Sequence, residues 1–299
     1  PTTCRRQRQM CIRDSSMMLA DSFKRKDAEG EQVEVEGNER NAIYAEIKAD
    51  PKLSIIEGDA DAAAVLANYN VQVEEIQSQQ IGTATENLCL SRIPGDSISS
   101  LCSSEATAAH GSDISMLVAH AFREMARASD IAIHNGGGVR NDIAKGDVTA
   151  GDAHKLLPFA NTLVEMKMTG AEIKAVLEEA MDFAFQPDGS TGAYPYAAGL
   201  RWHVDVSKPM GERVSGLEYK GRSDNSWVPL GTNTSYTVVT NSYVAGGRNG
   251  YLTFKMVKND GRSVDTYLND AQSFVDYVQA RGNIGKLPVS EYSTQRITR

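Results

Sequence analysis

Long apolar runs and positive charge are what this sequence most clearly lacks. No stretch approaches the roughly 20 apolar residues that a membrane-spanning helix needs. The formal net charge is −8, whereas a groove for nucleic acid needs a basic surface that neutralises phosphates. The 41% hydrophobic and 23% charged residues are typical of a globular protein. The composition therefore predicts a globular chain of one or two domains, with no membrane span and no nucleic-acid partner.

Motifs that hold catalytic metals or nucleophiles are also missing. The five histidines lie in A-H-G, A-H-A, I-H-N, A-H-K and W-H-V, so H-x-H, N-H-D and H-E-x-x-H are absent. A two-metal site needs converging ligands that hold the ions ~3.5–4 Å apart, and His110, His120 and His154 lack such a pattern. The serine motif G-x-S-x-G is absent too. The sequence therefore predicts that this chain binds no metal or cofactor and carries no catalytic residue.

Cysteine is scarce as well. Cys89 and Cys102 are the only cysteines beyond the first 14 residues, and their spacing allows a disulfide that closes a short loop. Such a bridge contributes ~3 kcal/mol in the chain-entropy model. It also indicates an oxidising compartment, for which we favour the periplasm. Two buried free thiols are the alternative.

Glycine-rich segments, by contrast, follow two predicted strands. Residues 129–134 have the pattern of a short apolar strand, and N-G-G-G-V-R follows from Asn135 to Arg140. These glycines allow close backbone approach and positive φ, and Arg140 can donate two hydrogen bonds to a phosphate or ribose. The β-patterned residues 236–239 precede the second segment, T-N-S-Y-V-A-G-G-R-N-G-Y. Ligands bind at strand ends in open α/β sheets, so a pocket is expected here; plain turns are the alternative.

A third segment, P-F-A-N at residues 158–161, completes a set of motifs. In chain order the three segments resemble N-G-G-G-[IV]-R, P-F-x-N, and an aromatic residue followed by G-x-D-G-[YF]. These motifs mark the C-terminal substrate-binding domain of the 5′-nucleotidase family. The resemblance runs from about residue 80 to the end. Within the family, the chain most resembles bacterial NAD nucleotidases and UDP-sugar hydrolases. The resemblance implies an α/β fold, a mixed α+β sandwich, preceded by a long linker helix.

The resemblance implies a nucleotide pocket in which the base lies between the rings of Phe159 and Tyr243. Such stacking is worth ~1–3 kcal/mol per base. The amides of Asn135 and Asn161 would serve the base edge or nearby backbone, and Arg140 would face the ribose or phosphate. The expected substrate-binding residues are Asn135, Gly137, Gly138, Arg140, Phe159, Asn161, Tyr243, Gly247, Arg248 and Asn249.

One position departs from the family pattern. Where the family has an aspartate that binds the ribose hydroxyls, this chain has Asn249, which lacks the negative charge and the second equivalent oxygen. We therefore expect weaker sugar binding. Taken singly, each residue also has a structural alternative, with Phe159 and Tyr243 in a core and Asn249 in a turn.

The N-terminal part of the chain is organised differently. Residues 1–14 hold four arginines and two cysteines without periodicity, and resemble translated adaptor or assembly-junction sequence. Residues 15–50, with a helix over 38–48, resemble the tail of an N-terminal metallophosphoesterase domain. Residues 51–82 are expected to contain the linker helix, over 59–80, and 83–299 to form the substrate-binding domain. An ordinary packed helix is the alternative over 59–80. Either way, the candidate buried positions are Ala63, Leu66, Ala67, Val73 and Ile76.

Periodicity predicts the elements of the substrate-binding domain. Helices are expected over 111–128, 169–185 and 273–281, and strands over 163–168, 200–206, 214–219 and 236–240. Thr169 and Glu172 have the spacing of a capping box. Tyr194 and Tyr196 are expected to pack in the core.

By the same resemblance, the complete enzyme hydrolyses nucleoside 5′-phosphates. In the NAD nucleotidase branch it cleaves NAD to AMP and nicotinamide mononucleotide, and these to nucleosides. Family members use two divalent metal ions in an N-terminal domain with an early D-x-H and a G-N-H-[DE] loop. Neither an early D-x-H nor the G-N-H-[DE] loop is found here. The chain alone is expected to be inactive, periplasmic or secreted, with a nucleotide or nucleoside and the missing metallophosphoesterase domain as partners. The alternatives are a non-catalytic nucleoside-binding module, a UDP-sugar hydrolase and a 2′,3′-cyclic phosphodiesterase.

Overall fold

The structure is a computed structural model that describes residues 16–19, 23–26, 32–50, 53–56 and 59–299. The segment 1–14, for which a foreign origin is expected, lies outside the described residues. Contacts divide the chain into two compact units, and the boundary falls between Glu74 and Glu75.

In its described residues, the first unit combines short strands with a helix and with most of a second, long helix. Its elements are β1 (Ser16–Leu19), β2 (Phe23–Lys26), β3 (Gln32–Val35), α2 (Gly37–Ala49) and β4 (Leu53–Ile56). β1 and β4 pair in parallel, and β2 and β3 form an antiparallel pair. The helix predicted over 38–48 is confirmed as α2, which buries Ile47.

A single long helix, α3 (Ala60–Gln77), follows. It confirms the helix predicted over 59–80. The rest of the segment 51–82 is not helical, because a strand occupies Leu53–Ile56 and another begins at Gln80. The predicted buried positions Ala63, Leu66, Ala67, Val73 and Ile76 are wrong, because α3 buries none of its residues. The exposed fraction is 61% for Leu66 and 58% for Ile76. Apolar periodicity shows that a helix has an apolar side, but it does not supply an element that covers it.

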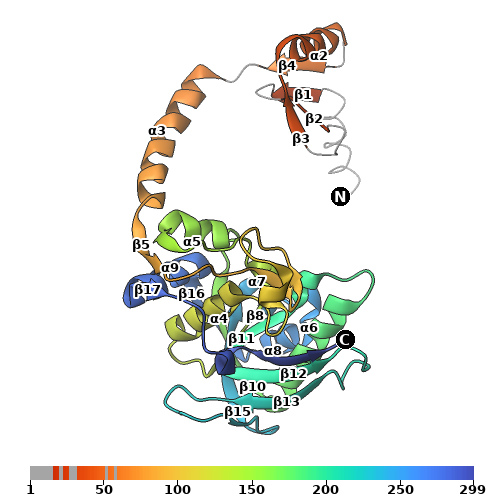
Figure 1. Ribbon diagram of the computed structural model, residues 1–299, viewed down its shortest axis with the longest axis vertical. Helices are drawn as coiled ribbons and strands as arrows, with labels where there is room; N and C mark the ends of the chain where they lie inside the picture. Colours follow the sequence, from red (N-terminus) through yellow and green to blue (C-terminus); the bar gives the residue numbers. More distant parts are fainter. Residues whose placement is uncertain (1–15, 20–22, 27–31, 51–52, 57–58) are drawn as a thin grey trace. The chain divides into compact units, whose positions relative to one another are not determined.

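The second unit is built around a mixed sheet of five strands (Figure 1). Their order is β11 (Pro195–Ala198), β8 (Ile131–Asn135), β15 (Ser235–Asn241), β10 (Thr162–Thr169) and β16 (Ser263–Asn269). β8 and β15 run parallel, and the other neighbours are antiparallel. The strands predicted over 163–168 and 236–240 are therefore confirmed at the centre of this sheet.

Three smaller sheets complete the β structure of this unit. One has the order β14 (Val228–Pro229), β13 (Val214–Tyr219), β12 (Leu200–Asp205) and β18 (Thr294–Thr298), which confirms the strands predicted over 200–206 and 214–219. Another has the order β17 (Asn283–Ile284), β5 (Gln80–Ala84) and β9 (Gly146–Thr149), and the third pairs β6 (Ser91–Ile93) with β7 (Asp96–Ser97).

The helices of this unit are α4 (Asp113–Met125), α5 (Ala150–Leu156), α6 (Gly170–Phe185), α7 (Ser242–Ala245), α8 (Leu252–Asn259) and α9 (Asp270–Arg281). They confirm the helices predicted over 111–128, 169–185 and 273–281. The capping box at the start of α6 is also confirmed, because Thr169 and Glu172 exchange side-chain and backbone hydrogen bonds. α9 begins earlier than predicted, where the Asn269 side chain accepts from the Gln272 backbone N–H.

Two apolar cores lie on opposite faces of the central sheet. Ile131 and Ile133 of β8 belong to the core that contains α6, whereas Ala132 between them belongs to the core that contains α4 and α9. Alternate residues of a strand point to opposite faces, so helices cover both sides of the sheet. Tyr194 and Tyr196 are fully buried in the first core, as predicted. The expected α/β sandwich is confirmed.

Candidate functional site

A cleft of about 400 Å³ opens where β8 and β15 end. These strands are parallel neighbours, so their carboxyl ends lie at the same edge of the sheet, the usual ligand edge of such folds. β8 leads into the turn η2 (Gly136–Gly138), and β15 leads into α7. Eight of the ten residues expected to bind substrate line this cleft: Asn135, Gly137, Gly138, Arg140, Phe159, Asn161, Tyr243 and Asn249.

The glycines of η2 lie so close to neighbouring groups that a side chain would not fit without moving them. None of them has a positive φ, so of the two properties that glycine allows, this turn uses close backbone approach. A Cβ atom on Gly137 would lie 2.9 Å from the carbonyl oxygen of Gly192 and 3.0 Å from Nη1 of Arg92. The missing side chain therefore lets this turn contact the turn η3 (Thr191–Ala193) and one arginine.

The Asn135 amide holds the floor of the cleft together. It is buried, its oxygen accepts from Nδ2 of Asn241 at 3.0 Å, and its nitrogen donates to the Gly192 carbonyl at 3.4 Å. Asn241 in turn caps α7 by accepting from the Val244 backbone N–H at 3.1 Å. Both groups of Asn135 are engaged by protein, so this side chain ties the two strand ends to η3.

Asn161 is held in a similar way at another wall. Its nitrogen donates to Asp270 Oδ2 at 3.0 Å, and its oxygen accepts from Ser242 Oγ at 3.4 Å. Burial raises the pKa of Asp270, against the opposing effect of the Asn161 hydrogen bond. The amide of Asn161 is thus fixed in orientation at the cleft wall.

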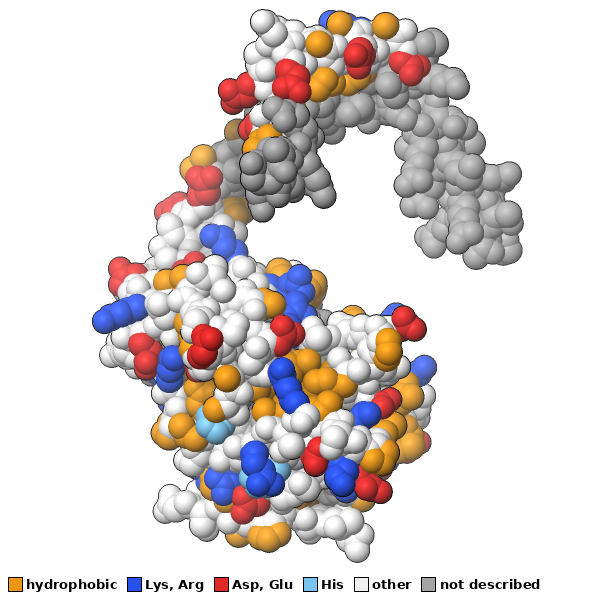
Figure 2. All heavy atoms as spheres, turned by 45° about the vertical axis from the view of Figure 1, so that its right-hand side comes forward, with side chains coloured by type: hydrophobic (Ala, Val, Ile, Leu, Met, Phe, Trp, Pro, Cys, Tyr) orange, Lys and Arg blue, Asp and Glu red, His pale blue; other side chains and the backbone are white. Residues whose placement is uncertain are grey.

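The two aromatic side chains are exposed, with 54% of Phe159 and 44% of Tyr243 accessible to solvent. The alternative that they belong to a core is wrong. Figure 2 shows apolar side chains, with basic ones among them, exposed on one face of this unit. The loop that carries each ring contains a residue with a left-handed backbone conformation. These residues are Ala160, with φ 51°, after Phe159, and Asn249, with φ 56°, after Tyr243. Backbone strain of this kind is most often retained at functional sites.

Two arginines supply the positive charge of the cleft. The Arg140 guanidinium carbon lies 5.8 Å from the centre of the Phe159 ring, within cation–π range. Arg92, from β6, lies against Gly137 and Gly192, and a Cβ atom on Gly192 would come within 2.4 Å of its Nη1. Burial, followed by the charge of Arg140, lowers the pKa of Arg92. Among the residues that the structure describes, no carboxylate lines the cleft, so these two charges favour an anionic ligand.

Arg92, Ser190 and Gly192 line the cleft but were not predicted. Arg92 stands outside any glycine-rich or aromatic motif, whereas Ser190 and Gly192 lie in the stretch D-G-S-T-G-A-Y-P-Y at residues 188–196. Only the fold brings the three residues to the site. Conversely, Gly247 and Arg248 do not line the cleft. Gly247, with φ 82°, begins the turn η4 (Arg248–Gly250) that positions Asn249, and Arg248 is exposed.

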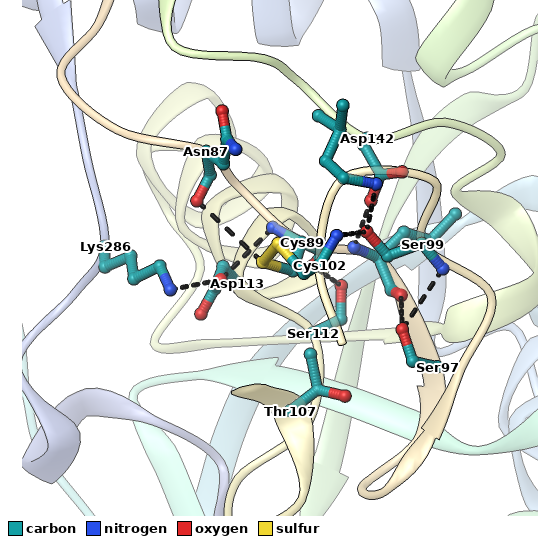
Figure 3. The surroundings of a disulfide bond; sticks show 12 residues. Asn87, Cys89, Ser97, Ser99, Cys102, Thr107, Ser112, Asp113, Asp142 and Lys286 are labelled. Carbon is teal, nitrogen blue, oxygen red and sulfur yellow. Dashed lines mark hydrogen bonds and ion pairs between the residues drawn. A yellow bond between two sulfur atoms is a disulfide. The ribbon is translucent and has the colours of Figure 1, made fainter. Parts of the chain in front are cut away.

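A disulfide joins Cys89 and Cys102, whose Cα atoms are 5.9 Å apart (Figure 3). The predicted bridge is confirmed, and the alternative of two free thiols is wrong. Its loop contains Arg92, and Asp142 connects it to the segment after Arg140. One carboxylate oxygen of Asp142 accepts from the Leu90 backbone N–H at 2.5 Å, and the other accepts from that of Ser100 at 2.8 Å. Both arginine-bearing segments are therefore linked beside the disulfide.

Neither metal ligation nor membrane insertion has structural support in the described ranges. Among these residues, no three His, Cys, Asp or Glu side chains gather to hold a metal ion. The D-A-H triplet at residues 152–154 has the D-x-H spacing of metal ligands, but the Asp152 carboxylate accepts hydrogen bonds from the backbone N–H and the hydroxyl of Thr149 in the cap of α5. No helix among the described residues has the length and apolar character that crossing a bilayer requires.

The family model for the C-terminal domain of 5′-nucleotidases matches residues 69–259. The chain belongs to the 5′-nucleotidase family. It is 36% identical to the NAD 5′-nucleotidase of Haemophilus influenzae, over 88% of this chain and 43% of that protein. It is 32% identical to a probable 5′-nucleotidase of Treponema pallidum, over 89% of this chain and 45% of that protein. This 5′-nucleotidase chain thus spans less than half the length of these two curated relatives.

Solved structures of 5′-nucleotidases agree with this assignment. The H. influenzae NAD nucleotidase structure matches with a TM-score of 0.67 and 33% identity, over 92% of this chain and 48% of that one. A 5′-nucleotidase precursor from Thermus thermophilus matches with a TM-score of 0.63 and 28% identity, over 93% of this chain and 54% of that one.

Proposed function

We propose that this 5′-nucleotidase-family chain binds nucleotides in the cleft, with the base between Phe159 and Tyr243 and the 5′-phosphate facing Arg92 and Arg140. One observation supports this most directly: two exposed rings from separate loops line the same cleft as two guanidinium groups, without a carboxylate. Rings stack on either face of a base, with ~1–3 kcal/mol per base. Guanidinium groups donate paired hydrogen bonds to phosphate oxygens.

The part that this chain plays in hydrolysis is to bind and orient the ester. The two metal ions that the family uses would activate a water molecule, and the described residues offer no site that fits them. Binding energy from the base, remote from phosphorus, would position the phosphate for attack. We propose residues 83–299 as the substrate-binding domain, 51–82 as the segment with the linker helix and 15–50 as the tail of a metallophosphoesterase domain.

The relatives guide the choice of substrate. Similarity to an NAD 5′-nucleotidase supports nucleoside 5′-phosphates and NAD as the ligands of the complete enzyme. The disulfide supports a periplasmic or secreted location. A non-catalytic nucleoside-binding module is the rival function. Hydrolysis by the complete protein distinguishes the two, because only a substrate-binding domain that works with a catalytic metal domain leads to release of phosphate.

Calorimetric titration of the purified chain with adenosine and AMP tests the pocket. We expect saturable binding of both, and a loss of at least about tenfold in affinity for Phe159→Ala and for Tyr243→Ala. Tyr267→Ala is the matched control, since Tyr267 is 85% exposed and does not line the cleft. Unchanged affinity in both cleft variants would refute the arrangement of the base.

A second assay tests the division of labour. The chain is incubated with AMP and added divalent metal, and released phosphate is measured. We expect no release above the metal-only blank. Release that depends on the chain would show that it carries catalytic groups of its own.

A further inference from the structure

Asparagine is followed by glycine at two places in the sequence, Asn135–Gly136 and Asn249–Gly250. In such a pair the backbone nitrogen of the glycine can attack the side-chain carbonyl carbon of the asparagine, because glycine has no Cβ atom to obstruct the approach. Both asparagines line the cleft. The structure holds them in different ways, so the fold decides which of the two is open to this reaction.

The first pair is held by the central sheet. Asn135 ends β8 and is buried, and its amide is bound on both sides, by Asn241 and by the Gly192 carbonyl. The backbone N–H of Gly136 donates to the Tyr194 carbonyl at 2.8 Å. The attack would break all three hydrogen bonds and leave buried polar groups without partners, which is costly. The fold therefore protects this pair.

The second pair lies in η4, a single turn in which no residue is buried. Asn249 has φ 56° and ψ 31°, and Gly247 and Gly250 both have φ 82°. Short turns with few buried contacts open locally at low free-energy cost, and glycine adds backbone freedom. Rotation about ψ of Asn249 then brings the Gly250 nitrogen to the side chain.

The surroundings of the Asn249 side chain also favour the attack. Its oxygen accepts from the Tyr243 hydroxyl at 3.1 Å, and no described residue accepts from its nitrogen. When the carbon is attacked, negative charge develops on this oxygen, and a donor that is already in place stabilises it. Arg92 and Arg140 line the same cleft, so their positive charges favour the same anion. The nitrogen can leave without breaking a hydrogen bond to a described residue.

We propose that Asn249 is a site of spontaneous deamidation, which converts it to aspartate or isoaspartate. Hydroxide removes the amide proton of Gly250, and the nitrogen forms a bond to Cγ of Asn249. The bond from Cγ to Nδ2 then breaks, and the nitrogen leaves as ammonia with a proton from water. Water opens the resulting succinimide ring. Opening at Cγ gives aspartate with the normal backbone, and opening at the main-chain carbonyl gives isoaspartate.

The reaction adds a negative charge to the cleft. Either product carries a carboxylate, whereas no carboxylate of the described residues lines the cleft of the unmodified chain. The charge that favours anionic ligands is thereby reduced. The inference goes beyond the proposed function, because it needs no bound nucleotide.

The experiment compares the two pairs in one sample. The purified chain is kept in mildly alkaline buffer, folded or in urea, and is digested with trypsin at intervals in heavy-oxygen water, which labels any conversion during digestion. Mass spectrometry then follows the peptides 128–140 and 249–255, which carry Asn135 and Asn249. In the folded chain we expect Asn249 to convert at least about tenfold faster than Asn135. In urea we expect the two rates to lie within about threefold of each other.

Two outcomes would overturn the proposal. If Asn249 in the folded chain converts no faster than Asn135, it is not a deamidation site of the native protein. If the difference between the two pairs is as large in urea as in the folded chain, the local sequence sets the rates and the structural account is wrong.

The part played by the hydroxyl is tested with Tyr243→Phe, which keeps the ring and removes the donor. Conversion of Asn249 should slow at least about threefold, and that of Asn135 should not change. An unchanged rate at Asn249 would refute the stabilisation of the anion by Tyr243.

Discussion

Reduction of the bridge between Cys89 and Cys102 should lower the free energy of unfolding by about 3 kcal/mol. The cysteines are 13 residues apart, and in the chain-entropy model a loop of this size restricts the unfolded chain by about that amount. The folded loop should persist after reduction, because Asp142 still accepts from backbone N–H groups in both of its arms. The loss then arises mainly in the unfolded state.

Urea unfolding in the presence and absence of a dithiol reductant measures this difference. A Cys4→Ser, Cys11→Ser background removes the cysteines near the N-terminus, so the reductant can act only on the bridge between Cys89 and Cys102. Cys102→Ser in the same background is the control, because the reductant should no longer change its unfolding curve. Equal unfolding free energies with and without reductant would refute the account of the loop.

The same samples report on the cleft. Arg92 lies inside the disulfide-closed loop, whereas Phe159 and Tyr243 do not. Because the folded loop, with Arg92 in it, persists, reduction should change the affinities for AMP and adenosine by less than about twofold. Equal losses for both ligands would instead indicate a general loosening of the unit.

Three further changes test other features, each against the parent chain. Burial, followed by nearby arginine and lysine charges, lowers the pKa of His120 to about 4. The imidazole of the unfolded chain has a pKa of about 6.5, so the free energy of unfolding should be full above that pH. It should fall by on the order of 3 kcal/mol as the pH is lowered to 4, because only the unfolded chain takes up the proton. Urea unfolding at several pH values measures this decline, and His120→Leu should flatten it. Buried Glu178 accepts from three backbone N–H groups within residues 211–214, so Glu178→Gln should cost about 2 kcal/mol of unfolding free energy by the same method; a loss under about 0.5 would contradict this. Gly137→Ala places a Cβ atom 3.0 Å from Nη1 of Arg92, so calorimetry should show AMP affinity lowered at least about tenfold, and unchanged affinity would show that Arg92 does not contact the phosphate.

Local patterns predicted local structure well. The capping box of Thr169 and Glu172 depends on residues three apart, and the structure forms it as expected. The inward side of α4 follows the same local rule, because Leu117, Val118 and Phe122 recur with helical spacing and are all buried. The motifs also brought most of the cleft residues together, since they follow strands that end at one edge of the sheet.

Features that depend on distant contacts were missed or misjudged. Arg92 reaches the cleft only because β6 is held beside η2 and η3, and nothing in its immediate sequence indicates this. The sequence left open whether the η2 glycines serve close approach or a positive φ, and only the fold shows that the close approach of Gly192 and Arg92 explains the glycine at 137. For α3, the apolar spacing suggested burial that no described residue provides.

The cleft draws its residues from five separate parts of the chain: β6, the β8–η2 turn, and the loops around Phe159, Ser190 and Tyr243. No short fragment holds all of these parts, so ligand binding reports that the whole second unit is folded. A ligand at a hundred times its dissociation constant should add about 2.7 kcal/mol to the unfolding free energy. Thermal-shift screening of a nucleotide library would therefore rank candidate substrates directly, without any need for turnover.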